Sequence, residues 1–233
     1  DRLHRGKNKK VCRPAAPAPP RQSLVLRPVM SLQLNPEGYR IGGADPLDLV
    51  ARYDAPLYVY DADRIVAQYR RLTNAFAGVP LRILYACKAN TNLSVLRLLK
   101  KAGAGVDAVS LQEVEMALLA GFEPHEILYT PNCVSFGELC AATELGVTIN
   151  IDNISVLEQF GHRYGGGVPV CIRLNPHIYA GGHGYLQTGH IDSKFGISIH
   201  QLRHILRVVK NNGMRVAGLH MHTGSDILDA EVF

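Results

Sequence analysis

One lysine directly follows a short apolar segment of the chain. Residues 81–86 (Leu-Arg-Ile-Leu-Tyr-Ala) are typical of a buried strand, and Cys87, Lys88 and a polar Ala-Asn-Thr-Asn turn come next. The end of a buried strand is partly removed from water, which disfavours the charged form of a lysine. A neutral amine is a nucleophile that forms a Schiff base with an aldehyde or carbonyl. The alternative is a solvated lysine that leaves the sheet, since most lysines are exposed, and this segment alone does not decide between them.

Two histidines end another predicted strand. Residues two apart in a strand point the same way, so His220 and His222 share a face. This pair could bind a metal, or one imidazole could lie flat against a cofactor ring. The following Thr-Gly-Ser-Asp sequence offers backbone N–H groups and the Ser225 hydroxyl at a helix start, which suits a phosphate. Core histidines followed by a plain helix cap are the remaining interpretation.

A long glycine-rich loop covers residues 175–196. Loops of this length at the end of a sheet are commonly lids or binding loops. Its histidines, His177, His183 and His190, are six and seven residues apart, and this spacing matches no standard ligand pattern, so we expect no metal site. Lys194 and Phe195 are expected to order the far end of the loop.

Strand and helix patterns alternate along the chain. The predicted strands are 56–60, 81–87, 105–109, 126–129, 147–151, 168–174 and 215–221. The predicted helices are 62–76, 92–102, 111–120, 135–145, 153–161 and 198–212, with caps at Asp61, Asn92, Ser110, Val134 or Ser135, and Asp152 or Asn153. From residue 81 the units recur at roughly twenty residues, which indicates an α/β fold with a parallel sheet.

Polar residues end several successive strands, among them Lys88, Asp107 and Arg173. This distribution favours a (β/α)8 TIM-type barrel, which builds its site on the carboxyl ends of all its strands. An open doubly wound sheet would gather them at one switch point, and the first strand is not followed by Gly-x-Gly-x-x-Gly. A closed barrel needs eight units and about six are visible, so we expect a truncated barrel.

The domain prediction has three parts. Residues 1–30 form a basic, Pro/Ala-rich tail without a core pattern, 31–56 form an irregular or β segment, and 57–233 form the incomplete barrel domain. The tail has three interpretations: upstream sequence translated by mistake before a true start at Met30, which we favour, a disordered extension, or an organelle transit peptide.

Composition narrows the class of protein. The chain has 233 residues and 47% hydrophobic content, enough for one large domain. The net charge of +5 comes from the tail, at +7, whereas the rest carries −2, so we expect no nucleic-acid partner. The five cysteines are odd in number and lack Cys-x-x-Cys spacing, which favours a reduced, cytoplasmic protein. No apolar segment reaches the length of a membrane span, so we expect no membrane partner.

Five motifs in this order resemble one enzyme family. They are Tyr-Ala-Cys-Lys-Ala-Asn at 85–90, Asp-Ala-Val-Ser-Leu-Gln-Glu at 107–113, Ile-Arg-Leu-Asn-Pro at 172–176, Thr-Gly-His-Ile-Asp-Ser-Lys-Phe-Gly at 188–196 and Gly-Leu-His-Met-His-Thr-Gly-Ser at 218–225. Over roughly residues 45–233 the chain resembles the pyridoxal-phosphate (PLP) decarboxylases with an alanine-racemase-like barrel, most closely the diaminopimelate decarboxylase group. Each motif alone is weak to moderate, but five in order are specific.

The resemblance implies roles for six residues. Lys88 matches the lysine that forms the Schiff base with PLP, and His222 matches the imidazole that stacks on the pyridine ring. Asp107 and Glu113 match carboxylates near the cofactor, Arg173 matches a cofactor-proximal arginine, and Ser225 matches a phosphate ligand. Lys88, His222 and Asp107 form the expected catalytic set.

The resemblance also implies an activity, conversion of meso-2,6-diaminopimelate to L-lysine and CO2 in lysine biosynthesis, with an amino-acid substrate and a homodimer. The alternatives are a sibling decarboxylase for ornithine, arginine or carboxynorspermidine, and a non-catalytic PLP-binding regulatory protein. Thr223 and Ile151-Asp-Asn153 depart mildly from the family pattern. The family's second phosphate loop, pyridine-binding glutamate, substrate-binding residues and C-terminal β-domain match nothing in this sequence, so we expect the piece itself to be inactive.

Overall fold

The structure is a computed structural model that describes residues 32–36, 38–178, 193–225 and 227–232. The first described elements are an antiparallel hairpin, β1 (Leu32–Asn35) with β2 (Gly38–Ile41), and helix α1 (Pro46–Tyr53). The sequence predicted an irregular or β segment here and missed the helix. Its start has an ordinary signal, since the Asp45 side chain accepts a hydrogen bond from the Leu47 N–H (2.8 Å) and Pro46 occupies the first turn.

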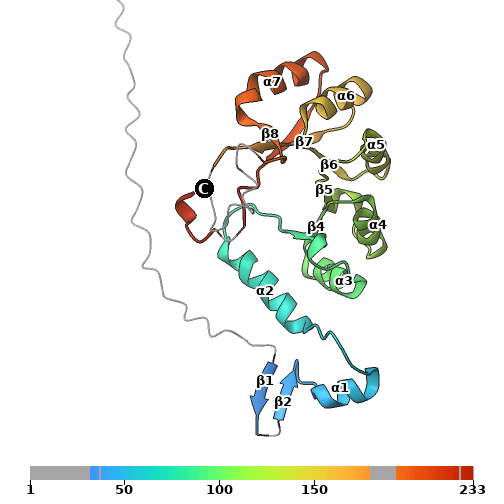
Figure 1. Cartoon of the computed structure of the whole chain (residues 1–233), viewed down its shortest axis with the longest axis vertical. Coiled ribbons are helices and arrows are strands. Elements are labelled where there is room, and N and C mark those ends of the chain that lie inside the picture. Colours follow the sequence, from blue (N-terminus) through green and yellow to red (C-terminus); the bar gives the residue numbers. More distant parts are fainter. Residues whose placement is uncertain (1–31, 37, 179–192, 226, 233) are drawn as a thin grey trace, which may run out of the picture. The chain divides into compact units, whose positions relative to one another are not determined.

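The main body contains a seven-stranded parallel sheet. Its strands are β3 (Leu84–Ala86), β4 (Gly105–Ala108), β5 (Ile127–Tyr129), β6 (Thr148–Ile151), β7 (Val170–Asn175), β8 (Ile197–Ser198) and β9 (Val216–His220). From β3 to β7 each strand pairs with the next strand along the chain, and β7 then pairs with both β8 and β9. The predicted parallel strand–helix alternation is therefore confirmed, with the short β8 as an addition (Figure 1).

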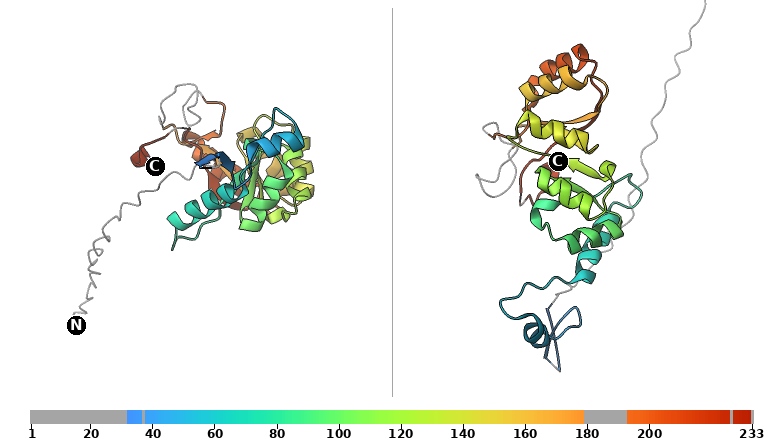
Figure 2. Two further views of the ribbon diagram at one scale, coloured as in Figure 1. Left: turned by 90° about the horizontal axis from the view of Figure 1, so that it is seen from below. Right: turned by 90° about the vertical axis from the view of Figure 1, so that its right-hand side faces the viewer.

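Helices alternate with the strands in the predicted order, and those that come after β3 lie on the outer side of the sheet (Figures 1 and 2). They are α2 (Ala62–Ala75), α3 (Leu93–Ala102), α4 (Leu111–Leu119), α5 (Phe136–Glu144), α6 (Ile154–Tyr164) and α7 (Leu202–Asn211). The short 3-10 helices are η1 (Cys87–Ala89), η2 (Pro124–Glu126), η4 (Ile199–Gln201) and η5 (Ala230–Val232). Side-chain caps at Asp61, Asn92, Ser110, Ser135 and Asn153 start five of the helices, each accepting backbone N–H bonds of the first turn. Among the described helices, none is long and apolar enough to cross a membrane.

The hydrophobic core lies between the sheet and these helices. Alternate strand residues face it and are almost fully buried, among them Val106, Ile127, Ile149 and Ile172. The other alternate residues point to the opposite side, which we call the inner face. The core therefore fixes which strand side chains can meet on the inner face.

The amino-terminal edge of the sheet departs from the prediction. Residues 56–60 were predicted to be a strand but pair with no described residue, and Tyr58 is 87% exposed. The predicted strand 81–87 shortens to β3, and Leu81 is 47% exposed. Both errors have one cause: β3 pairs only with β4 among the described strands, so apolar residues at this edge have no second neighbour to pack on.

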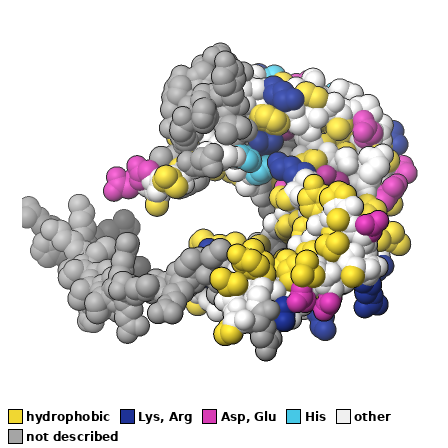
Figure 3. All heavy atoms as spheres, turned by 60° about the horizontal axis from the view of Figure 1, so that its bottom comes forward, with side chains coloured by type: hydrophobic (Ala, Val, Ile, Leu, Met, Phe, Trp, Pro, Cys, Tyr) yellow, Lys and Arg dark blue, Asp and Glu magenta, His cyan; other side chains and the backbone are white. Residues whose placement is uncertain are grey.

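Exposed apolar side chains remain around that edge (Figure 3). A groove of about 600 Å³ lies between α2, β3 and α3, and its walls include Ile65, Tyr69, Leu84 and Val95. The groove follows the open edge of β3 and extends to Ala89 and Asn90, the two residues directly after Lys88.

Candidate active site

Strand register brings the predicted polar residues to the inner face. In the pairs of neighbouring strands, Ala86 lies beside Asp107, and Arg173 lies beside His220. Because residues alternate along a strand, Thr130 shares the face of Asp107, and Asp152 shares that of Arg173. Polar groups from five strands or strand ends thus gather at the carboxyl-terminal end of the sheet, where parallel α/β sheets build their sites.

Lys88 lies in η1, immediately beyond β3, and its side chain is exposed. The expectation that Lys88 is partly desolvated is therefore wrong, because the open edge of β3 leaves the lysine in contact with water. The preceding residue behaves differently: Cys87 is fully buried, and burial, with the negative charges of Glu113 and Asp107, raises the pKa of its thiol to about 11. Cys87 is therefore a protonated packing residue beside an accessible amine.

Two carboxylates on the β4–α4 unit have different partners. Asp107 accepts a hydrogen bond from the Thr130 hydroxyl (Oδ1 to Oγ1, 2.5 Å), which fixes the carboxylate on the inner face. Glu113 accepts one from the backbone N–H of Val109 (2.8 Å), while its own N–H donates to the Ser110 hydroxyl (3.2 Å). Glu113 therefore stabilises the turn that follows β4, and its place near a cofactor stays a prediction.

Arg173 is a buried cation on β7, with 7% of its surface exposed. Burial lowers the pKa of its guanidinium, and the carboxylates of Asp152 and Asp107 oppose that shift. The guanidinium carbon lies 4.6 Å from the centre of the Phe195 ring, in cation–π geometry. Among the described residues no hydrogen-bond acceptor is seen for this guanidinium.

The two histidines after Arg173 are held in the neutral form. Burial, then repulsion from Arg173, lowers the pKa of His220 to about 4, and its Nδ1 is buried with no hydrogen-bond partner among the described residues. Burial, Arg173 and Lys88 lower the pKa of His222, whose Nδ1 accepts the Gly224 N–H at 3.2 Å. Lys88 in η1 and His222 after β9 both follow the carboxyl end of a strand of the sheet, and the charge of Lys88 disfavours protonation of His222.

The structure says less about Ser225 and the three histidines of the glycine-rich loop. Ser225 is exposed after β9 and makes no hydrogen bond to another described residue, so its phosphate role stays a prediction. His183 and His190 lie outside the described residues. The described part of the chain holds no cluster of three or more side chains able to bind a metal. His177 is described, and its ring meets that of His200 edge-on at 4.9 Å.

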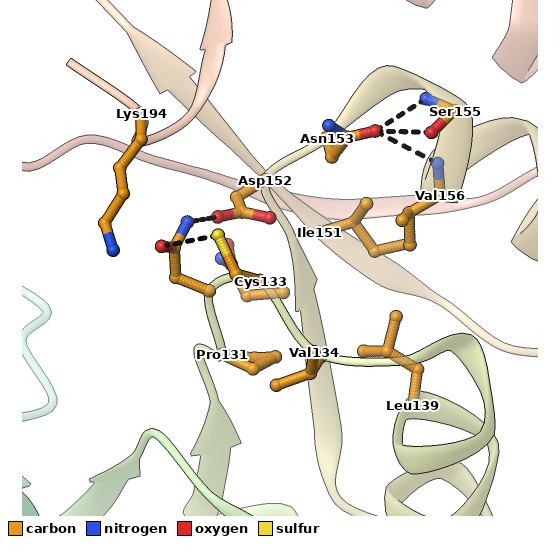
Figure 4. A pocket seen from close by; sticks show the side chains of 12 residues that line it. Pro131, Cys133, Val134, Leu139, Ile151, Asp152, Asn153, Ser155, Val156 and Lys194 are labelled. Atoms are coloured by element: carbon orange, nitrogen blue, oxygen red, sulfur yellow. Dashed lines mark hydrogen bonds between the residues drawn. The ribbon is translucent and has the colours of Figure 1, made fainter.

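A cavity of about 210 Å³ opens beside this set, between the loops that follow β5 and β6 (Figure 4). The Asn132 amide donates to the Asp152 carboxylate there, and Lys194 reaches the same cavity from the segment before β8. Asn150 also lines it, is 1% exposed, and has no described partner for either amide atom. No role was predicted for Thr130 or Asn150. Their only signal was position near the ends of alternating strands.

The chain resembles known proteins over most of its length. Residues 62–233 match the family described as "Pyridoxal-dependent decarboxylase, pyridoxal binding domain". The chain belongs to this family. The match includes Lys88, Asp107, Glu113, Arg173, His222 and Ser225, although it assigns no individual role to them.

The decarboxylase relatives are longer than this chain. A diaminopimelate decarboxylase of Methanothermobacter thermautotrophicus is 44% identical over 87% of this chain and 48% of its own length, and one of Bacillus subtilis is 35% identical over 83% and 46%. The solved diaminopimelate decarboxylase of Helicobacter pylori, complexed with L-lysine, has a TM-score of 0.73 and 32% identity over 79% of this chain and 48% of its own. The chain spans about half the length of the curated relatives it matches, which agrees with a barrel of incomplete length.

The described residues fit a pyridoxal phosphate cofactor. An exposed primary amine suits an aldehyde, and a neutral imidazole suits the face of an aromatic ring. A buried guanidinium without a described hydrogen-bond acceptor suits an anionic group. The family assignment and the donor set therefore point to the same cofactor.

Proposed function

We propose that the chain serves a PLP-dependent amino-acid decarboxylase that converts meso-2,6-diaminopimelate to L-lysine and CO2. The observation that supports the proposal is that Lys88, Asp107, Arg173 and His222 all stand at the carboxyl ends of strands of the one parallel sheet. Relatives named diaminopimelate decarboxylase, at up to 44% identity, support this substrate.

Each of the six predicted site residues has a separate proposed role. Lys88 offers the amine that holds the cofactor aldehyde, and His222, uncharged at neutral pH, packs against the ring without adding charge. Arg173 balances negative charge, and Asp107 is kept in place by Thr130. Ser225 is proposed to bind the phosphate, and Glu113 to hold the turn after β4. The bound pyridoxal ring supplies the sink for the electron pair released when a Cα–carboxylate bond breaks.

Chemical trapping tests the assignment of Lys88. The chain is incubated with PLP, reduced with borohydride, digested, and analysed by peptide mass spectrometry. We expect the label on the peptide that contains Lys88, and its loss in Lys88→Ala. Lys101→Ala is the matched control, because Lys101 is an exposed lysine near the end of α3. Equal labelling of Lys88 and Lys101 would contradict the proposal.

The substrate and the assembly need their own measurements. CO2 release by the full-length enzyme should be faster with meso-2,6-diaminopimelate than with ornithine, and the reverse order would favour a sibling decarboxylase. We also propose a homodimer, tested by sedimentation, and a cytoplasmic location, tested by cell fractionation. The free thiols of the four described cysteines support a reducing compartment.

A further inference from the structure

Phe195 is the one aromatic side chain with two cations over its ring among the described residues. The Arg173 guanidinium carbon lies 4.6 Å from the ring centre, and the Lys194 ammonium nitrogen lies 5.2 Å from it. The face of an aromatic ring carries partial negative charge, so it attracts cations, and the attraction grows when the pair is desolvated. Arg173 is the buried member of the two, since Lys194 is exposed.

The backbone fixes Phe195 at this place. Ile197 in β8 pairs with Leu174 in β7, so the preceding residues run beside the carboxyl end of β7. Gly196 has φ +78°, and a Cβ built there would lie 2.9 Å from the Asn175 nitrogen and 3.3 Å from Cγ of Arg173. Only glycine allows this close approach, and the approach brings the ring of the residue before it up to Arg173.

Arg173 has few other restraints. The carboxylates of Asp107 on β4 and Asp152 after β6 attract its charge, but neither makes a hydrogen bond to it. Its position matters for the neighbouring histidines, because its charge lowers the pKa of both His220 and His222. Three other groups act on these imidazoles: Asp107 raises both pKa values, Lys88 lowers that of His222, and His222 lowers that of His220.

We propose that Phe195 is a positioning residue whose ring holds the Arg173 guanidinium over the inner face, beside His220 and His222. Phe195 acts through Arg173 and touches no reacting group itself. The cofactor consequence rests on the proposed function: a displaced guanidinium would no longer meet the anionic cofactor. The effect on the histidines does not need that function, so the two can be tested separately.

Histidine titration of the cofactor-free chain is the decisive experiment. The pKa values of His220 and His222 are measured by ¹H–¹⁵N NMR in the wild type, Phe195→Leu and Phe195→Tyr. We expect both pKa values to rise in Phe195→Leu by about half a unit or more, since a nearby positive charge has moved away. Phe195→Tyr keeps the ring and should keep the wild-type values. Should Phe195→Leu fail to fold, Phe195→Met removes the ring with a flexible side chain.

Two further variants separate positioning from general loss of stability. Phe122→Leu is matched, because the Lys100 ammonium lies 5.4 Å from the Phe122 ring, away from the inner face. It should leave both pKa values unchanged. In an Arg173→Gln background, Phe195→Leu should add no further shift. Unchanged histidine pKa values in Phe195→Leu, or an equal shift in Phe122→Leu, would overturn the proposal.

Cofactor binding provides the second readout. We expect the dissociation constant of PLP to rise about tenfold in Phe195→Leu and to stay near the wild-type value in Phe195→Tyr. If the full-length wild type binds no PLP, the proposed function fails while the titration result stands. If PLP binds equally well in Phe195→Leu and the wild type, the positioning role fails while the proposed function stands.

Discussion

His220 should make the stability of this chain fall steeply in mild acid. Its folded-state pKa is about 4, against an ordinary value of 6.5. Between these values the unfolded chain binds a proton that the folded chain does not, so lowering the pH favours unfolding. The contribution of neutral His220 is complete above 6.5 and is lost as the pH falls toward 4. Relative to neutral pH, the loss at about pH 4.5 amounts to about 2 kcal/mol, because partial exposure of the imidazole to water weakens the effect.

The assay is urea unfolding at about pH 7.5 and about pH 4.5. His220→Asn removes the imidazole, so we expect the free energy of unfolding to drop by about 2 kcal/mol less between the two pH values than it does in the wild type. The comparison uses the change with pH, which cancels the pH-independent cost of the substitution. His162→Asn is the control, because His162 is exposed on α6. Parallel pH dependence in the wild type and His220→Asn would refute the reasoning.

Two further predictions concern stability. Gly196→Ala should lower the free energy of unfolding by about 3 kcal/mol or more, because the new Cβ meets the backbone of β7. The control is Gly213→Ala, also at positive φ (+59°) but with open space around it, which should cost about 1 kcal/mol. Equal losses of stability in thermal unfolding of the two variants would contradict this prediction. Asn150→Leu should stabilise the chain by about 1 kcal/mol in calorimetry, because it removes a buried amide with no described hydrogen-bond partner. Asn153→Leu, the control, should destabilise the chain by about 1 kcal/mol, because it removes the cap of α6. Destabilisation by Asn150→Leu would show that the amide has a partner.

Much of the fold follows from local signals in the sequence. The caps at Asn92 and Ser110, and Gly103 in the left-handed conformation after α3, set helix bounds within one or two residues of the prediction. The strands 105–109 and 147–151 were placed equally well, since each is a short apolar segment between a glycine and a cap. The bounds of such elements depend on residues close in sequence, so the pattern of apolar residues, glycines and caps can predict them.

The errors involve tertiary surroundings. The 56–60 segment has the composition of a strand, but a strand also needs a partner, and the described residues offer none. The exposure of Lys88 has the same origin at the β3 edge. The role of Phe195 depends on β8, a two-residue strand too short to leave a periodic pattern.

The sequence predicted which side chains belong to the site, but not the contacts that position them. Lys88, Arg173 and His222 could be chosen because amine, guanidinium and imidazole groups stand at strand ends in recognisable motifs. Thr130 could not, because its importance comes from one hydrogen bond to a carboxylate 23 residues away. The neutral state of His220 likewise depends on burial and on a charge from a neighbouring strand.

The order of the sheet also bears on how the chain can fold. From β3 to β7, every strand lies beside the one made just before it, so most pairings close only short stretches of chain. Short closures cost little entropy and favour rapid folding. A chain that leaves the ribosome residue by residue can add one strand–helix unit at a time onto an edge that already exists. The vulnerable species during synthesis is therefore a growing sheet with two open edges, β3 and the newest strand, and chaperones that shield such edges would suit it better than those that enclose a fully unfolded chain.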